Sequence, residues 1–327
     1  MTTADQRIVT ASGDDVAAMA EAIVAAHAAT FRPPPGEPDA LLMADDLLEG
    51  NAADPVDRAA YQATRRLGFI PIDAACLARA WQAQTSRTGR FDPAAWPAHP
   101  SDFGLQPWPR QHAFPPCPRR LGLYAVLPDA AWVGRMARAG VPTVQLRFKS
   151  DDADAVRREV AAAVAAVRDT GSLLFINDHW QAAVDAGAYG VHLGQEDLDA
   201  LTTPEIAGLR AAGIRLGVST HGYAEMLRAD AVSPSYIAMG AVFPTTLKKM
   251  ATAPQGLARL NAYAALMRDH ALVAIGGIDA ARLPAVLQSG VGSVAVVRAL
   301  VAAENPEAVA AAFQADIARG GTATSAQ

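Results

Sequence analysis

The chain has 327 residues, 19% of them charged and 51% hydrophobic, and its formal net charge is -5. This balance excludes a disordered or collagen-like chain and gives no support for binding nucleic acid. The two cysteines, Cys76 and Cys117, are too few for a disulfide framework or a multi-cysteine zinc site. Because the sequence shows neither an apolar run long enough to span a membrane nor a signal-peptide pattern, it predicts a soluble, cytoplasmic protein.

Residues 1–92 predict a small α/β extension whose role the sequence does not reveal. The extension contains no phosphate-binding glycine loop and no cluster of metal ligands. Its expected strands are 7–12 and 41–44, and its expected helices are 14–30, 57–67 and 73–82.

A proline-rich segment follows at 93–120, with eight prolines between residues 93 and 118. Such density prevents a regular helix or a central strand, so we expect a linker or an extended arm. Two tryptophans, Trp96 and Trp108, favour an arm packed against a surface over an unattached tether.

Residues 121–320 alternate short apolar runs with alanine-rich helical stretches. The runs are continuous in apolar residues, which is typical of parallel strands buried on both faces. Eight such β-α units in about 200 residues are the number found in a compact (β/α)8 TIM barrel. An open doubly wound sheet is the alternative, but no G-x-G-x-x-G follows the first strand. The expected strands are 123–127, 143–148, 173–177, 190–193, 215–219, 236–240, 272–276 and 293–297.

In such a barrel, functional groups gather where the strands end. The second strand ends in Gln145, Arg147 and Lys149, which alternation places on one strand face, and a basic pair there suits an oligoanion. Asp178 and Asp197 follow the next two strands. Because neighbouring parallel strands lie about 4.8 Å apart, the two carboxylates can share one Mg²⁺ with substrate phosphates, whereas each alone could simply cap a helix.

Further anion-binding groups follow strands five to eight. Ser219 can donate to a phosphate oxygen or cap the next helix, and these two interpretations stay equally open. A hydroxyl- and ammonium-bearing loop follows strand six, a glycine pair follows strand seven, and Val297 and Arg298 end strand eight. The top face therefore predicts a metal-assisted diphosphate site and a separate monophosphate site, with His192 in a structural role. The loop residues are Thr245, Thr246, Leu247 and Lys248, and the second glycine is Gly277.

From about residue 121 to 300 the chain resembles the thiamine-phosphate synthase (thiamine-phosphate pyrophosphorylase) family. The motifs that carry the likeness occur in the family's order and are highly specific together. They are Q-L-R-x-K at 145–149, N-D at 177–178, G-V-H-L-G-Q-E-D at 190–197, G-V-S-T-H at 217–221, F-P-T at 243–245, A-P-Q-G-L at 253–257 and A-I-G-G-I at 274–278.

The resemblance implies a transferase that condenses 4-amino-5-hydroxymethyl-2-methylpyrimidine diphosphate with a thiazole phosphate, giving thiamine phosphate and diphosphate. It implies that diphosphate leaves first and that Asp178 and Asp197 bind Mg²⁺ as the cofactor. The residues implied to hold the pyrimidine diphosphate are Gln145, Arg147, Lys149, Asn177, Ser219 and Lys248, with catalytic roles for Arg147, Lys149, Ser219 and Lys248. Those implied to line the thiazole-phosphate site are Thr245, Thr246, Leu247, Gly277, Val297 and Arg298. The expected partners are these small molecules, with neither nucleic acid nor a membrane, and a homodimer is compatible with the sequence.

Two positions depart from the family pattern, and both lie in the implied thiazole-phosphate site. The family's loop usually reads T-x-T-K, but here Leu247 stands in place of a hydroxyl; strand eight usually ends in Val-Ser, but here Arg298 follows Val297. One hypothesis is that Arg298 replaces the lost hydroxyls with a bidentate phosphate contact. The rival is a second-substrate site that has drifted in specificity or rate.

Two other functions remain open from the sequence. A thiazole tautomerase-like barrel could use His221 for proton transfer, but it would not need the carboxylate pair or the Arg147–Lys149 clamp. A non-catalytic regulatory barrel could instead bind thiazole phosphate, which the two departures favour.

Overall fold

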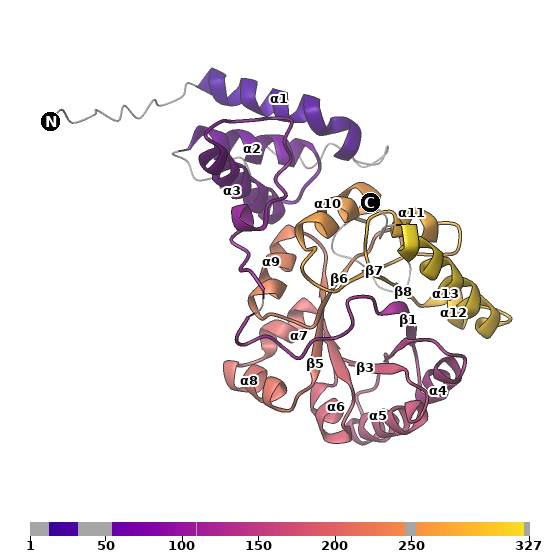
Figure 1. Cartoon of the computed structure of the whole chain (residues 1–327). Coiled ribbons are helices and arrows are strands. Elements are labelled where there is room, and N and C mark those ends of the chain that lie inside the picture. The colour runs from indigo at the N-terminus through magenta and orange to yellow at the C-terminus, as the bar shows by residue number, and fades with distance from the viewer. Residues whose placement is uncertain (1–12, 32–53, 109, 246–252, 324–327) are drawn as a thin grey trace. The chain divides into compact units, whose positions relative to one another are not determined.

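The computed structural model describes residues 13–31, 54–108, 110–245 and 253–323 (Figure 1). The chain divides into two compact units, Met1–Gln106 and Pro107–Gln327. The division falls inside the proline-rich segment predicted at 93–120 rather than at either of its ends. Each unit is therefore described by itself.

The described part of the first unit is helical. The three predicted helices are present, and the two predicted strands lie outside the described residues. Asp54 begins the second helix by accepting hydrogen bonds from the backbone N–H groups of Val56 and Asp57, and Gly89 ends the third in the left-handed conformation, with φ 75°. The helices are α1 (Gly13–Phe31), α2 (Pro55–Arg66) and α3 (Pro71–Thr88), with a 3-10 turn, η3 (Pro100–Phe103).

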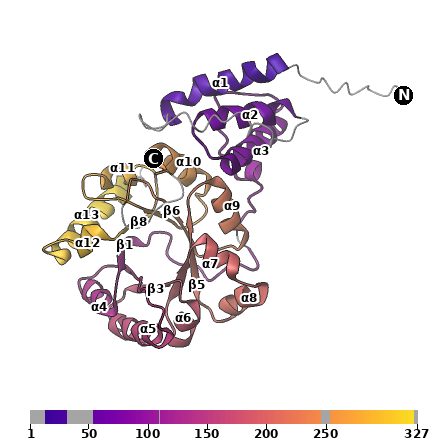
Figure 2. The same ribbon diagram turned by 180° about the vertical axis from the view of Figure 1, so that it is seen from behind.

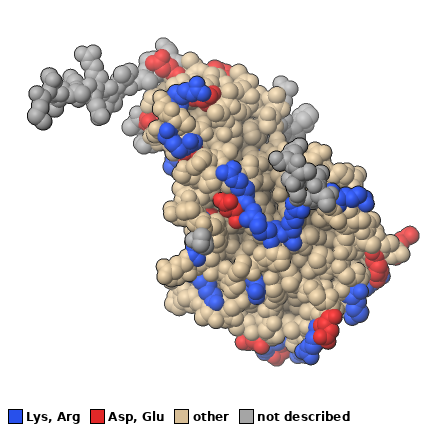
Figure 3. Space-filling model, in the orientation of Figure 1, with Lys and Arg blue, Asp and Glu red and all other residues tan. Residues whose placement is uncertain are grey.

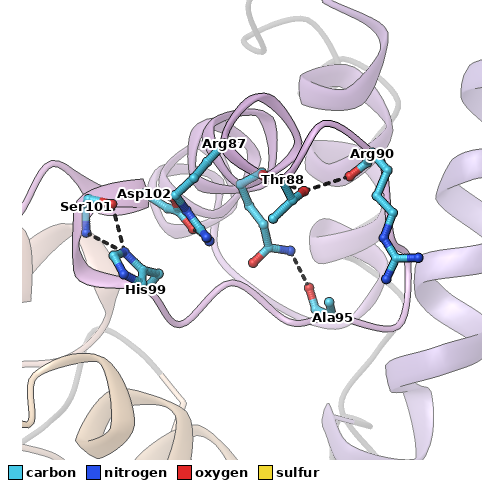
Figure 4. Close-up of polar contacts among 8 residues, drawn as sticks. Arg87, Thr88, Arg90, Ala95, His99, Ser101 and Asp102 are labelled. Atoms are coloured by element: carbon cyan, nitrogen blue, oxygen red, sulfur yellow. Dashed lines mark hydrogen bonds and ion pairs between the residues drawn. The ribbon is translucent and has the colours of Figure 1, made fainter.

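Residues 93–106 pack against the helices of the first unit. The ring of Trp96 lies 5.4 Å from that of Trp81 and 5.0 Å from that of His27, measured between centroids. Figure 4 shows the polar contacts, in which Arg87 of α3 makes two hydrogen bonds to Asp102, of 2.7 and 2.8 Å. This half of the proline-rich segment is thus an arm attached to its own unit, because polar and aromatic contacts hold it along its length.

The second unit contains a closed barrel of eight parallel strands in sequence order, which confirms the predicted (β/α)8 fold. Helices surround the strands, as the two opposite views show (Figures 1 and 2). The strands are β1 (Gly122–Leu127), β2 (Thr143–Leu146), β3 (Leu173–Asn177), β4 (Gly190–Leu193), β5 (Arg215–Thr220), β6 (Tyr236–Met239), β7 (Leu272–Ile275) and β8 (Ser293–Val296). The helices are α4 (Ala130–Arg138), α5 (Ala153–Val167), α6 (Trp180–Ala186), α7 (Gln195–Ala200), α8 (Thr203–Ala211), α9 (Tyr223–Ala231), α10 (Gly256–Leu266), α11 (Leu283–Leu287), α12 (Arg298–Val301) and α13 (Pro306–Ala323).

Large rings inside the barrel lean over glycines of the neighbouring strand. Phe175 of β3 is in register with Gly190 of β4, and Tyr236 of β6 is in register with Gly217 of β5. A Cβ atom added at Gly190 would lie 2.3 Å from the Phe175 ring, and one at Gly217 would lie 2.1 Å from the Tyr236 ring. These glycines therefore make room for the aromatic core of the barrel.

Residues 107–108 and 110–118 pack against the barrel. The guanidinium of Arg110 donates to the carboxylate and to the carbonyl oxygen of Asp230, both at 2.7 Å, and His270 contacts the same carboxylate at 2.7 Å. Nearer the barrel, the hydroxyl of Ser235 donates to the carbonyl of Pro115 at 2.7 Å. The second half of the proline-rich segment is thus fixed to the barrel by buried polar contacts.

We expect Asp230→Asn to destabilise the barrel unit at neutral pH by about 2 kcal/mol, the usual contribution of hydrogen bonds to a charged group. Burial opposes ionisation, but hydrogen bonds from His270 and Arg110 outweigh it and hold the pKa of Asp230 below its ordinary value. A lowered folded-state pKa gives stability above the ordinary pKa that is lost as the pH falls through the folded one. Urea unfolding from pH 7 to 3 should therefore show the difference between the wild type and Asp230→Asn shrinking below about pH 4. A difference that is constant with pH would contradict this assignment.

Charged side chains are sparse on the face of the molecule that Figure 3 shows. Among the described residues, no helix is long and apolar enough to cross a membrane. Figure 3 shows one short curved band of basic side chains and otherwise scattered charges on a mostly uncharged face.

Candidate active site

The basic pair predicted after the second strand lies on a loop. β2 ends at Leu146, in register with Leu127 at the end of β1, so the strand is two residues shorter than predicted. Gln145 lies on the strand and is buried, whereas Arg147 is half-buried and Lys149 is exposed. The backbone N–H of Arg147 still donates to Leu127 at 2.7 Å. The prediction that strand alternation aligns all three side chains is therefore wrong beyond residue 146, because the neighbouring strand β1 has ended.

The two predicted metal ligands come together. Asn177 ends β3, and Asp178 follows it with φ 63°, in the left-handed region that is uncommon for residues other than glycine. Burial raises the pKa of Asp178, and the adjacent carboxyl of Asp197 raises it further, whereas the charge of Arg147 acts in the opposite direction. Two carboxyl groups in contact, held partly out of water, form a site where a cation would relieve the repulsion between their charges.

Asp197 caps the start of α7 and lies against Asp178. It is the third residue of α7, and its carboxylate accepts a hydrogen bond of 3.1 Å from the backbone N–H of Gly194. The same side chain contacts Asp178. Its helix-capping hydrogen bond holds the carboxylate in place beside that of Asp178. Capping and metal binding are therefore compatible here, because a carboxylate has lone pairs for both.

Ser219 lies near the end of β5 and does not cap the next helix. The first residue before α9 is Gly222, with no side-chain cap. The Ser219 hydroxyl is 2.7 Å from Nε2 of His192, and its carbonyl accepts from the side-chain amide of Gln195 at 2.7 Å. Of the two interpretations of Ser219 that the sequence left open, helix capping is therefore excluded, and contact with an anion remains.

The loops after β6 and β7 are packed backbone to backbone. The N–H of Phe243 donates to the carbonyl of Gly276 at 3.0 Å. A Cβ atom at Gly277, where φ is 64°, would lie 2.7 Å from the carbonyl oxygen of Pro244. This close approach requires glycine and holds the loop that carries Thr245 beside Gly277.

The remaining residues predicted for the monophosphate site are placed only in part. Val297 is half-buried after β8, and Arg298 is exposed at the first position of α12. Thr246, Leu247 and Lys248 lie outside the described residues. His221, the proton-transfer candidate of the tautomerase alternative, contacts Glu225 through Nδ1 at 2.7 Å.

Two residues that sequence reasoning missed lie directly behind the site. Tyr124 and Tyr236 are fully buried inside the barrel, and their hydroxyl groups are 2.7 Å apart. Both lie in apolar strand segments of the sequence, where a tyrosine is normally interpreted as a core residue. The one available signal was the hydroxyl itself, because a buried phenol needs a polar partner.

The chain's likeness to known proteins fits this geometry. A family model described as thiamine monophosphate synthase matches residues 123–300. The chain belongs to the thiamine monophosphate synthase family. The matched span lies wholly within the barrel unit and includes every strand end described above.

Individual relatives agree with the family match. The chain is 56% identical over 202 residues to a thiamine-phosphate synthase of Neisseria meningitidis serogroup B, covering 62% of this chain and 97% of that protein. It is 51% identical over 198 residues to a thiamine-phosphate synthase of Serratia proteamaculans, covering 61% and 92%. Among solved structures, it resembles a thiamine phosphate pyrophosphorylase of Pyrococcus furiosus with a TM-score of 0.53 and 26% identity, covering 62% of this chain and 98% of that one. Each of these relatives is matched over more than nine-tenths of its own length, whereas 62% or less of this chain is covered.

Proposed function

We propose that the chain is a thiamine-phosphate synthase, a transferase that joins 4-amino-5-hydroxymethyl-2-methylpyrimidine diphosphate to a thiazole phosphate. The observation that carries the proposal is the contact between Asp178 and Asp197 beside the charge of Arg147, at the strand ends of a barrel of this family. A carboxylate pair next to a guanidinium can hold a diphosphate and its metal ion together.

Asp178 and Asp197 would hold Mg²⁺, and the donor set fits this ion. Mg²⁺ prefers carboxylate oxygens and often keeps only one or two protein ligands, taking the others from water and substrate phosphates. The bound ion would neutralise charge on the diphosphate group. No third carboxylate, histidine or cysteine among the described residues completes an all-protein metal cage. That composition agrees with a metal that is shared with the substrate.

The reaction asks this chain for positioning and for stabilisation of negative charge. The bond between the pyrimidine methylene carbon and the diphosphate oxygen breaks, and its electron pair leaves with diphosphate. The thiazole nitrogen then donates its lone pair to the methylene cation. Arg147, Lys149, Lys248 and Ser219 would bind the departing oxygens, and Gln145 and Asn177 would orient the pyrimidine. No general base is required, because no proton has to be removed for the new bond to form.

The thiazole phosphate would bind where the loops after β6, β7 and β8 meet. Thr245 and the backbone of Gly277 are held together there by the close approach of the two loops. We place Thr246, Leu247, Val297 and Arg298 in the same site on the strength of the family pattern. We also propose a cytoplasmic location, in line with the two free thiols, Cys76 and Cys117. We propose a homodimer as well, which light scattering of the purified protein tests.

The test is to incubate the purified full-length chain with both substrates, with and without Mg²⁺, and to measure diphosphate and thiamine phosphate. We expect equal amounts of the two products, formed only when both substrates and Mg²⁺ are present. Tight thiazole-phosphate binding without diphosphate release would favour the regulatory barrel. Isomerisation of the thiazole ring alone would favour the tautomerase, in which His221 would act.

Arg298→Ser should raise the KM for thiazole phosphate about tenfold and leave the KM for the pyrimidine diphosphate unchanged. The loss of one charge-assisted phosphate contact accounts for this factor. Steady-state kinetics with each substrate varied in turn measures both values. An unchanged thiazole-phosphate KM would remove Arg298 from this site.

Lysine-to-arginine substitutions should affect turnover at two of the three lysines. Only three of the 28 Lys and Arg residues are lysines: Lys149, Lys248 and Lys249. A compact ammonium and a planar guanidinium present different geometry to a phosphate oxygen. We therefore expect Lys149→Arg and Lys248→Arg each to lower kcat, and Lys249→Arg, the matched control, to be nearly silent. Equal kcat values in all three variants would show that the positions are interchangeable.

A further inference from the structure

A continuous chain of hydrogen bonds crosses the interior of the barrel behind the site. Nε2 of Gln145 donates to the hydroxyl of Tyr124 at 2.9 Å, and this hydroxyl lies 2.7 Å from that of Tyr236. The Tyr236 hydroxyl is 2.7 Å from Nδ1 of His192, and Nε2 of His192 is 2.7 Å from the hydroxyl of Ser219. The hydrogen-bond chain thus joins β2 to β5 through β1, β6 and β4. The residues at its two ends, Gln145 and Ser219, are both assigned to the pyrimidine diphosphate.

The three residues in the middle of this hydrogen-bond chain are tightly packed and shielded from solvent. The exposed fractions of Tyr124 and Tyr236 are 1% and 0%, and that of His192 is 8%. The His192 and Tyr236 rings are stacked, with centroids 5.7 Å apart and planes inclined by 19°. The ring of Tyr236 fits only because Gly217 lies beneath it. Packing therefore leaves these hydrogen bonds little freedom to rearrange.

Both phenols keep their protons. Burial is the largest cause that raises the pKa of each above its ordinary value, and for Tyr236 the neighbouring Tyr124 raises it further. Each tyrosine hydroxyl consequently has one proton to donate and lone pairs to accept with.

The donor at one end of the chain determines the direction of every bond after it. The amide nitrogen of Gln145 can only donate, so the Tyr124 oxygen accepts there and the Tyr124 proton points to Tyr236. The Tyr236 proton then points to Nδ1 of His192. A neutral imidazole with an acceptor at Nδ1 carries its proton on Nε2, which donates to the Ser219 oxygen. The proton of Ser219 is left to donate outside the chain.

We propose that Tyr124, Tyr236 and His192 are positioning residues that orient Ser219 as a hydrogen-bond donor toward the diphosphate. The inference rests on the proposed function for the identity of the anion. A donor that is already oriented loses no reorganisation energy when charge develops on the leaving oxygens. At the other end, the use of the Gln145 nitrogen in the chain leaves its carbonyl oxygen as an acceptor for a ligand N–H. The two ends thus match an aminopyrimidine that carries a phosphate group.

The first test measures the tautomer of His192 in the full-length protein without substrates. Nitrogen-15 NMR of histidine-labelled protein distinguishes protonated from unprotonated ring nitrogens, and His192→Asn identifies the resonance. We expect the proton on Nε2 and none on Nδ1. A proton on Nδ1 would reverse the direction of the chain and overturn the proposal.

The second test measures kinetics in Tyr124→Phe and Tyr236→Phe. Each variant removes one hydroxyl, and each should lower kcat for diphosphate release about tenfold while the KM for thiazole phosphate stays unchanged. The matched control is Tyr263→Phe in α10. It removes a buried hydroxyl that donates to the side-chain oxygen of Gln255 at 2.9 Å and takes no part in the hydrogen-bond chain. The control should keep kcat within about twofold. An equal fall in kcat for the control and the two variants would show that any lost buried hydroxyl has this effect, and would overturn the proposal.

The two tests separate this inference from the proposed function. The tautomer of His192 is measured without substrate, so its outcome does not depend on whether the protein makes thiamine phosphate. An inactive wild-type protein with the proton of His192 on Nε2 would refute the proposed synthase and keep the orientation of Ser219. An active wild-type protein with the proton of His192 on Nδ1 would support the proposed synthase and refute the orientation of Ser219.

Discussion

Asp178→Asn is expected to reduce Mg²⁺-dependent diphosphate release by about 100-fold or more, because it removes one of the two proposed Mg²⁺ ligands. The ion would then be held less well where negative charge develops on the leaving diphosphate. Asparagine is the right replacement because it tolerates the left-handed backbone that Asp178 adopts, with φ 63°. Asp197 is the poorer target, since its carboxylate also caps α7 and its loss would disturb the helix. Diphosphate release at saturating substrates, measured across a Mg²⁺ titration, gives the result.

The same variant should be more stable than the wild type when no metal is present. The folded-state pKa of Asp178 is raised by burial and by Asp197, so its ionisation destabilises the fold at neutral pH. The metal-depleted wild type should therefore become more stable as the pH falls toward that raised pKa, and Asp178→Asn should remove this dependence. We expect Tm without metal to rise by about 2 °C in the variant, and Mg²⁺ to raise Tm in the wild type only.

Asp185→Asn is the matched control, because Asp185 is an exposed aspartate on the neighbouring helix α6. It should leave turnover and the Mg²⁺ effect on Tm unchanged. Turnover in Asp178→Asn equal to that of the control would remove Asp178 from the metal site.

Gly217→Ala should destabilise the barrel by about 3 kcal/mol, the largest stability effect that we expect from adding one methyl group. The added Cβ would lie 2.1 and 2.3 Å from two atoms of the Tyr236 ring and 2.4 Å from its hydroxyl oxygen, and that side chain is fully buried. Relief would require the ring to leave its place in the aromatic core. Urea unfolding followed by circular dichroism measures the loss of stability.

Gly208→Ala is the opposite case and serves as the control. Gly208 is exposed within α8, and a Cβ atom added there would meet nothing within 4 Å. Alanine favours a helix over glycine, so this variant should gain about 0.5 to 1 kcal/mol. A Gly217→Ala variant as stable as the wild type would show that the Tyr236 ring can move, and would weaken the rigidity on which the orientation of Ser219 depends.

The barrel was predictable because its signals are local. Apolar runs bounded by helical stretches located all eight strands, with end points that differ from the structure by at most two residues. The end of β2 was misplaced, because a strand stops where its neighbour β1 stops, and the register between the two strands cannot be read from the apolar pattern of either one. The carboxylate pair was predictable for a related reason: the topology of the barrel places the ends of consecutive strands side by side.

The first unit shows the limit of the same approach. Its three helices followed from local pattern, and Asp54, Pro55 and Gly89 are ordinary helix-end signals. The way in which the proline-rich segment is shared between the two units depends instead on side-chain contacts such as Arg87 with Asp102 and Arg110 with Asp230. Nothing in the proline spacing identifies those partners, so the boundary at residue 106 could not be located from the sequence.

The sequence by itself determined the fold, the family and the types of residue at the strand ends. These rest on periodicity and on motifs that are short in sequence. The tertiary structure alone decided what Ser219 contacts, which depends on how β5 lies beside β4. It alone decided why Gly217 is a glycine, which depends on the register of β5 with β6. It alone connected Gln145 to Ser219 through two tyrosines and a histidine that look like core residues. Hydrogen-bond direction is a property of a closed set of partners, and only the folded barrel brings that set together.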